Sequence, residues 1–261
     1  MPSNDRCYPA LGRRLHSVWY RHLRVYTRNL VSNGLPPFLE PVIFLVGIGI
    51  GLGKYITSMD GMPYLLFLAT ALPITSSMFT AAYECTFGTF IRLEFEKAYD
   101  GMLAAPITVR DLFVGELLWA GTKGLFFAAC VVVVMACFGT APMPGSLLSP
   151  VVGFLTGTMF GALSLLVTSF VKNINHFNFY FTGLLSPMFF FSGTVFPLRS
   201  LPASLRPVAE LFPLTHSVRL ARSLALGQVE PLLLLDLLFL VALTAIAAEV
   251  AIERLRRRMV L

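Results

Sequence analysis

Charged residues are scarce in this sequence. They make up 13% of the 261 residues, about half the fraction found in an ordinary soluble domain. Hydrophobic residues make up 56%, and apolar stretches long enough to cross a hydrocarbon core of about 30 Å recur along the chain. Such a chain has too little polar surface for a water-soluble fold, so we expect an all-α integral membrane protein.

Catalytic, metal-binding and nucleotide-binding motifs are also missing. The four histidines are scattered, and neither H-E-x-x-H nor G-x-S-x-G occurs. The stretch GIGIGLGKY (47–55) is not a phosphate loop, because no glycine precedes Gly53-Lys54 at the required spacing and Tyr55 replaces the hydroxyl that binds Mg²⁺. We therefore expect no enzyme, no metal site and no cofactor in this chain.

Cysteines are few and have no metal or redox spacing. Cys7 and Cys85 lie far apart, whereas Cys130 and Cys137 share one apolar stretch. We expect free thiols. The first 35 residues also lack the short hydrophobic core of a signal peptide, so we expect no cleavage there.

Six apolar stretches predict six transmembrane helices in a domain covering 36–261, preceded by a cytoplasmic arm (1–35). The predicted spans are Pro36–Gly53, Pro63–Tyr83, Phe113–Phe138, Leu147–Val171, Phe177–Val195 and Leu232–Ala251. Most lysines and arginines fall on the side that carries the termini, which predicts that both termini are cytoplasmic. This placement also accounts for the net charge of +6 without a nucleic-acid partner.

The arm itself predicts an amphipathic helix. Residues 12–30 place Leu15, Trp19, Leu23 and Tyr26 on one face, with most arginines elsewhere. A helix of this kind lies in the membrane interface with its arginines at anionic headgroups. A solvated basic arm that only sets the topology is the alternative.

Small residues in two spans predict close helix packing. Glycines four apart let a neighbouring helix approach closely, and the packing could be within one protomer or against a second copy. The residues are Gly47, Gly49, Gly51 and Gly53 in the first span and Gly157 and Gly161 in the fourth.

The cytoplasmic loop between the second and third spans (about 84–112) predicts a protein-docking site. We expect a short helix from Arg92 to Leu103 that exposes charges of both signs beside aromatic and aliphatic side chains. A solvated connector would not need so many apolar residues. The residues assigned to docking are Arg92, Glu94, Glu96, Tyr99, Asp100, Met102 and Leu103.

Basic residues on the outer side oppose the usual charge bias. Prolines between the fifth and sixth spans predict short re-entrant helices over 197–230, and His216, Arg219 and Arg222 recur there at helical spacing. They could meet an anionic or sugar-bearing amphiphile, or they could snorkel to lipid phosphates. Ionisable residues inside spans are functional candidates, and Glu116 and Lys123 lie on one face of the third span, although interfacial anchoring is the commoner explanation.

Three stretches carry a resemblance to a known family: EPVIFLVGIGIGLG (40–53), EFEKAYDGMLAAPIT (94–108) and FFFSGTVFPLRSLPASLRPVAELFPLTHSVRLAR (189–222). With the basic N-terminal helix, they resemble the six-span permease subunits of ABC-2-type exporters, particularly nodulation lipooligosaccharide exporters. Lys97-Ala98-Tyr99-Asp100 stands where the family commonly places a glutamate near the leucine pair.

The resemblance implies a bacterial inner-membrane permease that works as two copies with two ABC ATP-binding subunits, which hold the ATP and Mg²⁺. Residues around Glu94–Leu103 would be a coupling helix, and the implied cargo is an amphiphile such as a lipo-oligosaccharide or glycolipid. Export of drugs or other hydrophobic compounds is the alternative. An ion channel would need repeated polar positions along several spans, and an intramembrane enzyme would need a convergent polar set; neither is present.

Overall fold

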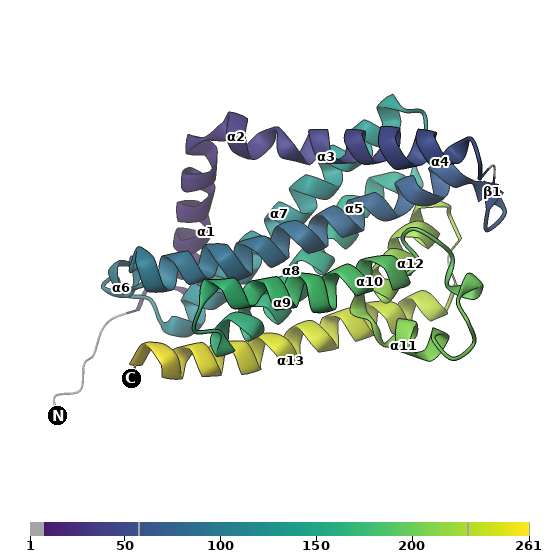
Figure 1. Ribbon diagram of the computed structural model, residues 1–261. Helices are drawn as coiled ribbons and strands as arrows, with labels where there is room; N and C mark the ends of the chain where they lie inside the picture. Colours follow the sequence, from purple (N-terminus) through teal and green to yellow (C-terminus); the bar gives the residue numbers. More distant parts are fainter. Residues whose placement is uncertain (1–7, 57, 229, 261) are drawn as a thin grey trace.

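The protein is built almost entirely from helices (Figure 1). The computed structural model describes residues 8–56, 58–228 and 230–260. The longer helices are α1 (Leu11–Arg28), α5 (Tyr64–Tyr83), α7 (Val109–Cys137), α8 (Ser149–Phe170), α12 (Pro213–Ala225) and α13 (Leu232–Val260). The shorter helices are α2 (Leu30–Gly34), α3 (Pro36–Phe44), α4 (Gly51–Gly53), α6 (Ala98–Leu103), α9 (Phe177–Tyr180), α10 (Ser186–Phe191) and α11 (Arg206–Leu211).

Wider and tighter helical turns join these helices. The π-helical turns are η1 (Leu45–Ile50), η2 (Glu84–Gly88), η3 (Ile91–Phe95) and η6 (Phe181–Leu185). The 3₁₀ turns are η4 (Gly145–Leu148), η5 (Ile174–His176) and η7 (Leu198–Ser200). Two short antiparallel strands, β1 (Ser58–Met59) and β2 (Met62–Pro63), pair Met59 with Met62 in a hairpin before α5.

Five helical segments in the described part of the chain are long and apolar enough to cross a membrane. They are Leu30–Gly53, Tyr64–Phe95, Val109–Cys137, Gly145–Phe170 and Leu232–Met259. The all-α membrane class is therefore confirmed, but a count of six spans is not. The predicted fifth span is continuously helical only from Phe177 to Phe191, about 22 Å at 1.5 Å per residue.

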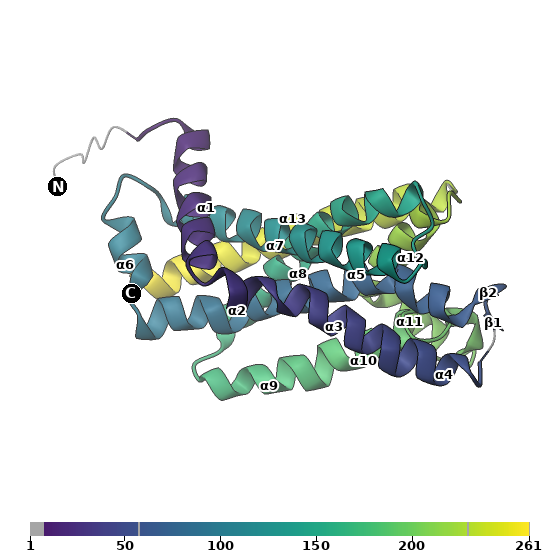
Figure 2. The same ribbon diagram turned by 90° about the horizontal axis from the view of Figure 1, so that it is seen from above.

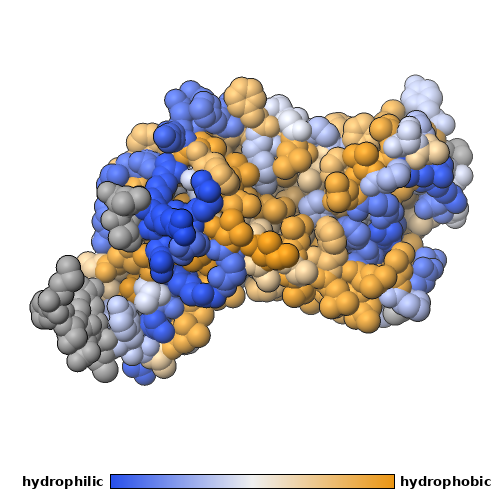
Figure 3. Space-filling view, turned by 90° about the horizontal axis from the view of Figure 1, so that it is seen from below, coloured by the Kyte–Doolittle hydropathy of each residue, from blue (hydrophilic) through white to orange (hydrophobic). Residues whose placement is uncertain are grey.

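Hydrophobic surface lies between two hydrophilic ends. Figure 3 shows orange residues across the middle of one face, with blue residues gathered at the end that carries the C-terminal part of α13 and a smaller blue group at the other end. An apolar band between polar ends is what a bilayer requires of a spanning bundle.

Glycines allow α7 and α8 to pack closely. A Cβ atom on Gly124 of α7 would lie 2.5 Å from the backbone oxygen of Gly153 on α8, and one on Gly157 would lie 2.9 Å from the backbone oxygen of Ala120. A Cβ atom on Gly161 would lie 3.0 Å from the Cβ atom of Ala120. Gly157 and Gly161 therefore pack within the protomer.

The glycines of the first span behave differently. A Cβ atom on Gly49 would meet Leu65 of α5, whereas one on Gly47, Gly51 or Gly53 would meet nothing within 4 Å. Three of the four glycines therefore play no part in packing within the described chain.

Helix α1 crosses the end of the bundle at a steep angle (Figures 1 and 2). Val18 packs against Gly115 of α7, where an added Cβ would lie 2.5 Å from Val18 Cγ1. Trp19 Nε1 donates a hydrogen bond to Thr122 Oγ1 over 3.0 Å. These contacts fix α1 to the first half of α7.

The loop before α7 ends in a capping box. Thr108 Oγ1 accepts a hydrogen bond from the backbone N–H of Asp111, and Asp111 Oδ2 accepts one from the backbone N–H of Thr108. This arrangement satisfies N–H groups that the helix start leaves without partners. Asp111 also forms an ion pair with Arg14 of α1, so the cap joins the two helices.

The expectation of one helix from Arg92 to Leu103 is wrong. The π-helical turn η3 ends at Phe95, Lys97 adopts a left-handed backbone conformation with φ of 49°, and α6 begins at Ala98. A left-handed residue cannot continue a right-handed helix. The helix therefore breaks at Lys97, and in the new helix that follows the Tyr99 hydroxyl contacts Arg92 and Glu116.

Cys85, Cys130 and Cys137 are free thiols. Cys7 lies outside the described residues.

Candidate functional site

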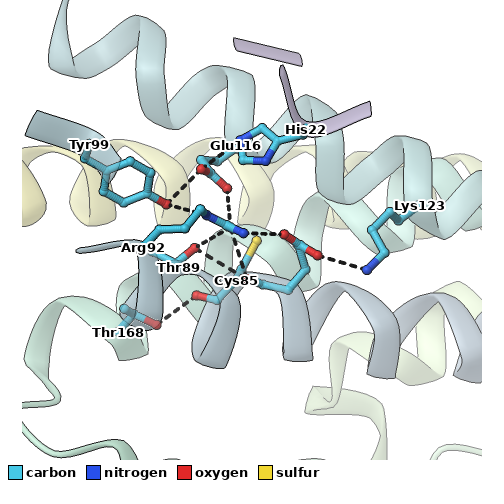
Figure 4. A network of polar contacts seen from close by, with 9 residues as sticks. His22, Cys85, Thr89, Arg92, Tyr99, Glu116, Lys123 and Thr168 are labelled. Atoms are coloured by element: carbon cyan, nitrogen blue, oxygen red, sulfur yellow. Dashed lines mark hydrogen bonds and ion pairs between the residues drawn. The ribbon is translucent and has the colours of Figure 1, made fainter. Parts of the chain in front are cut away.

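Arg92 joins a buried and a partly buried carboxylate at the end of the bundle that carries α1 and α6 (Figure 4). Its Nη2 donates to Glu116 Oε2 of α7 over 2.7 Å, and its Nη1 donates to Glu84 Oε1 of η2 over 2.8 Å. Glu116 is completely buried. Charge-assisted bonds of this length are among the stronger protein hydrogen bonds.

Tyr99 links α6 to the same carboxylate. Its hydroxyl donates to Glu116 Oε1 over 2.8 Å and accepts a hydrogen bond from Arg92 Nε over 3.2 Å. Only 1% of the Tyr99 surface is exposed. Burial raises the pKa of Tyr99 above its usual value, so the phenol keeps its proton and remains a donor to Glu116.

Two further side chains complete the network, which we define as His22, Glu84, Arg92, Tyr99, Glu116 and Lys123. His22 Nε2 of α1 lies 2.9 Å from Glu116 Oε1. Lys123 Nζ of α7 lies 2.9 Å from Glu84 Oε2. The network thus connects α1, α6, α7 and the helical extension of α5 (84–95) through ionic contacts and hydrogen bonds (Figure 4).

The network also contains a group of atoms with metal-ligand chemistry. One ligand atom from each of His22, Glu84 and Glu116 lies within 4.8 Å of the others. However, the guanidinium of Arg92 already bonds both carboxylates and Lys123 bonds Glu84. Two cations balance two anions, so these carboxylates need no metal ion to be stable in the interior.

The residues predicted to dock a partner fall into two groups. Arg92 is partly buried and Tyr99 is buried, and both side chains join the network. Tyr99 is therefore not available for a direct contact with a partner, because the helix breaks at Lys97 and the Tyr99 hydroxyl bonds Glu116. Met102 and Leu103 are partly buried against the main core. The side chains of Glu96 and Asp100 are exposed at the surface of the protein.

Glu94 has a further internal role. Its Oε1 accepts a hydrogen bond from Arg258 Nη2 over 2.8 Å. Arg258 also donates to the backbone oxygens of Thr168 and Val171 at the end of α8, each over 2.8 Å. Glu94 therefore ties the segment before α6 to α8 and the C-terminal turn of α13.

The basic residues of α12 do not form one face. Arg219 donates to Glu210 over 2.7 and 3.1 Å and to Asp236 of α13 over 3.1 Å. His216 Nδ1 lies 2.6 Å from the other oxygen of Asp236, which is 1% exposed. Burial alone would lower the pKa of Arg219, but the bonds from Glu210 and the charge of Asp236 raise it.

Arg222 turns the other way, toward α5. Its Nε donates to Thr70 Oγ1 over 3.1 Å and its Nη2 donates to the backbone oxygen of Phe67 over 3.0 Å. Its guanidinium carbon lies 3.9 Å from the centroid of the Phe67 ring. No acidic side chain in the described parts of the chain forms an ion pair with it.

The five residues assigned to a substrate pathway therefore form three groups. Glu116 and Lys123 do not contact each other directly, but Arg92 and Glu84 connect them. His216 and Arg219 share Asp236, and Arg222 stands apart. The α12 residues lie toward the opposite end of the bundle from α1 and α6 (Figure 1).

Sequence reasoning missed His22 and Glu84. The predicted second span stops at Tyr83, one residue before Glu84, although the helical segment continues to Phe95. Continuing the apolar pattern past Glu84 would have revealed an acid inside a span, which is a functional signal. The sequence contains no comparable signal for His22, because a polar residue in a basic amphipathic segment is expected whether or not it has a function.

Comparisons with known proteins agree with this architecture. The family model described as ABC-2 type transporter matches residues 13–226. Nodulation protein J of Sinorhizobium fredii (strain NBRC 101917 / NGR234) is 35% identical over 212 residues, which cover 81% of each chain. Nodulation protein J of Neorhizobium galegae is 30% identical over 244 residues, 93% of each chain.

A more distant relative carries a transport name. Inner membrane transport permease YadH of Escherichia coli (strain K12) is 23% identical over 204 residues, which cover 78% of this chain and 79% of that one.

Proposed function

The chain belongs to the ABC-2 type transporter family, and we propose from this premise that it is the permease of an exporter driven by a separate ATP-binding subunit. It is a transporter protein rather than an enzyme. Its sequence has no phosphate loop, so ATP and Mg²⁺ would be held by the partner.

The observation that carries this proposal is the bond from Tyr99 to Glu116. Tyr99 stands on α6, next to the exposed Glu96 and Asp100, and its hydroxyl reaches a buried carboxylate on α7 over 2.8 Å. A partner that docks on Glu96 and Asp100 and moves α6 would pull on α7 through this bond. The same movement would reach the extension of α5 through Arg92, which bonds both Tyr99 and Glu84.

The proposed cargo is an amphiphile. Relatives named Nodulation protein J match most of this chain, and the chain resembles nodulation lipooligosaccharide exporters. A lipo-oligosaccharide has an apolar part suited to the hydrophobic middle of the bundle and a polar part suited to the hydrophilic outer end.

The proposed orientation puts α6 and both termini in the cytoplasm of a bacterium and α12 outside. In this arrangement α9, η6 and α10 make the sixth crossing, because α8 ends near α6 whereas α12 lies at the other end of the bundle (Figure 1). A second copy would cover α3 and α4, where Gly51 has no neighbour and Ile43 is 68% exposed.

Charge reversal on α6 tests the coupling. The permease is purified with its ATP-binding subunit, and co-purification is measured for Glu96→Arg and Asp100→Arg. Both should lower the amount of bound subunit without lowering the thermal stability of the permease, since exposed substitutions change stability by only about 0.5 kcal/mol. Glu253→Arg, also exposed and near the same end, is the control. Normal binding and normal export in both variants would contradict the docking assignment.

A further inference from the structure

A polar groove of about 410 Å³ opens at the α12 end of the molecule. It lies between the β1–β2 hairpin, the segment after α10 and one face of α12. Its lining carries three guanidinium groups but one carboxylate. The residues that line it are Asp60, Met62, Ser192, Gly193, Pro197, Leu198, Arg199, Thr215, Val218, Arg219, Arg222, Ser223, Leu226 and Gln228.

Two of the three arginines are already neutralised. Arg199 forms an ion pair with Asp60, the carboxylate of the lining. Arg219 is held by Glu210 and by the buried Asp236. The excess positive charge of the groove is therefore that of Arg222.

Arg222 is held in place entirely by neutral groups. Thr70 Oγ1 and the backbone oxygen of Phe67 accept from its Nε and Nη2, and these bonds orient the guanidinium without balancing its charge. Burial lowers the pKa of Arg222 to about 10, which still leaves it protonated at neutral pH. A fixed, partly desolvated guanidinium is well suited to bind an oxyanion, because little side-chain freedom remains to be lost.

The other side of the groove offers space near this charge, and its lining includes a hydroxyl without a hydrogen-bond partner in the described chain. Nη1 of Arg222 lies 4.0 Å from where a Cβ atom on Gly193 would stand, and Gly193 has none. The neighbouring Ser192 is 1% exposed, and its Oγ has no hydrogen-bond partner among the described residues. A buried hydroxyl without a partner carries a free-energy cost of about 1–3 kcal/mol, which a bound acceptor would remove.

We propose that this groove is a binding site for a tetrahedral oxyanion, a phosphate or sulfate ester, with Arg222 as its charge partner and Ser192 as a further donor. If the exported amphiphile carries an anionic headgroup, this groove would bind it, and that part of the proposal rests on the proposed function. Binding of the anion itself depends only on the groove. The same chemistry could be supplied by the headgroup of an amphiphile or by a free anion.

The test uses the full-length chain purified in a neutral detergent without any ATP-binding subunit. Native mass spectrometry measures binding of dihexanoyl phosphatidylglycerol, with dihexanoyl phosphatidylcholine as the zwitterionic comparison. Isothermal titration measures binding of inorganic phosphate. The ATP-binding subunit is absent from this experiment, so its result does not depend on export. A chain that binds no anion would contradict the groove proposal but not the export proposal. A chain that binds the anion but exports nothing with its ATP-binding subunit would contradict only the export proposal.

A set of variants distinguishes binding in the groove from general attraction to positive surface charge. Arg222→Gln should weaken phosphatidylglycerol binding about tenfold, since a hydrogen bond to a charged group is lost. Arg222→Lys and Ser192→Ala should each weaken it several-fold. Lys54→Gln removes an equal charge at an exposed position outside the lining of the groove, and should change nothing.

Binding of phosphatidylglycerol but not of inorganic phosphate would identify a headgroup site. Binding of inorganic phosphate as tightly as phosphatidylglycerol would identify a free-anion site. Either result supports the proposal. Wild-type affinity in Arg222→Gln, or an equal loss in Lys54→Gln, would overturn it. If Arg222→Gln does not fold, unchanged affinity in both Arg222→Lys and Ser192→Ala would overturn it as well.

Discussion

The guanidinium of Arg92 lies 2.7 Å from the carboxylate of Glu116, although 24 residues separate them. Glu116 is completely buried, so this contact balances a charge that water cannot reach. The same guanidinium also bonds Glu84, whose other oxygen bonds Lys123. One arginine therefore holds the extension of α5 and the first half of α7 together.

Removal of this guanidinium should destabilise the protein strongly. Arg92→Gln leaves two inward-facing carboxylates with less compensation, and breaking a buried ion pair from one side costs about 3–5 kcal/mol. The measurement is the free energy of unfolding of the purified permease in detergent. Arg110→Gln is the matched control, because its pair with Glu249 is exposed and such pairs contribute about 1 kcal/mol or less. Equal losses in the two variants would show that the network does not support the fold.

The Tyr99 hydroxyl should contribute to both stability and coupling. Tyr99→Phe keeps the ring but removes the donor to Glu116, so we expect a loss of about 1.5–3 kcal/mol, the range for hydrogen bonds to charged groups. The ATP-binding subunit should still bind, while export per ATP hydrolysed falls. Tyr55→Phe, at a ring that is 85% exposed, should leave both quantities unchanged. If Tyr99→Phe behaves like Tyr55→Phe, Tyr99 does not transmit movement from α6.

We expect Arg219 mainly to stabilise the folded protein. Arg219→Gln leaves the buried Asp236 with His216 as its remaining ionic partner, and we expect unfolding to become easier by about 1.5–3 kcal/mol. Arg219→Lys should recover part of this, because lysine keeps the charge but not the fork that reaches two carboxylates. Thermal unfolding of the two variants beside Arg206→Gln checks this. Full stability of Arg219→Gln together with lost export would instead place Arg219 in the transport path.

Glycine substitutions should distinguish the two glycine-rich surfaces. Gly157→Ala would place a Cβ atom 2.9 Å from the backbone oxygen of Ala120, and overpacking of this kind costs about 1–3 kcal/mol. Gly51→Ala meets no neighbour and should be neutral or stabilising by up to about 1 kcal/mol, since alanine favours a helix. Unfolding measurements on the purified protein, in whatever oligomeric state it adopts in detergent, decide the matter. A large loss in Gly51→Ala would show that a neighbour absent from this chain covers that face.

The sequence alone determined the membrane class and the approximate position of most spans. Both depend on local properties, because about 20 consecutive apolar residues suffice to cross a bilayer whatever surrounds them. The small-residue spacing at Gly157 and Gly161 likewise predicted a closely packed face. A span that ends in an ion-pair network, such as the one containing Glu84, was harder to delimit, because the charged residue interrupts the apolar pattern while the helix continues.

Only the tertiary structure decided which charged residues meet. Periodicity tells which side chains share one helix face, but not which helix covers that face or which distant acid faces a given base. Tyr99 became an internal link because a left-handed residue, Lys97, breaks the helix just before it. Arg219 and Arg222 lie three residues apart on one helix, yet Asp236 on α13 neutralises Arg219 whereas α5 offers Arg222 only neutral acceptors. Both guanidiniums are charged, but their different partners follow from the packing of α12 between α5 and α13, which no local pattern in the sequence specifies.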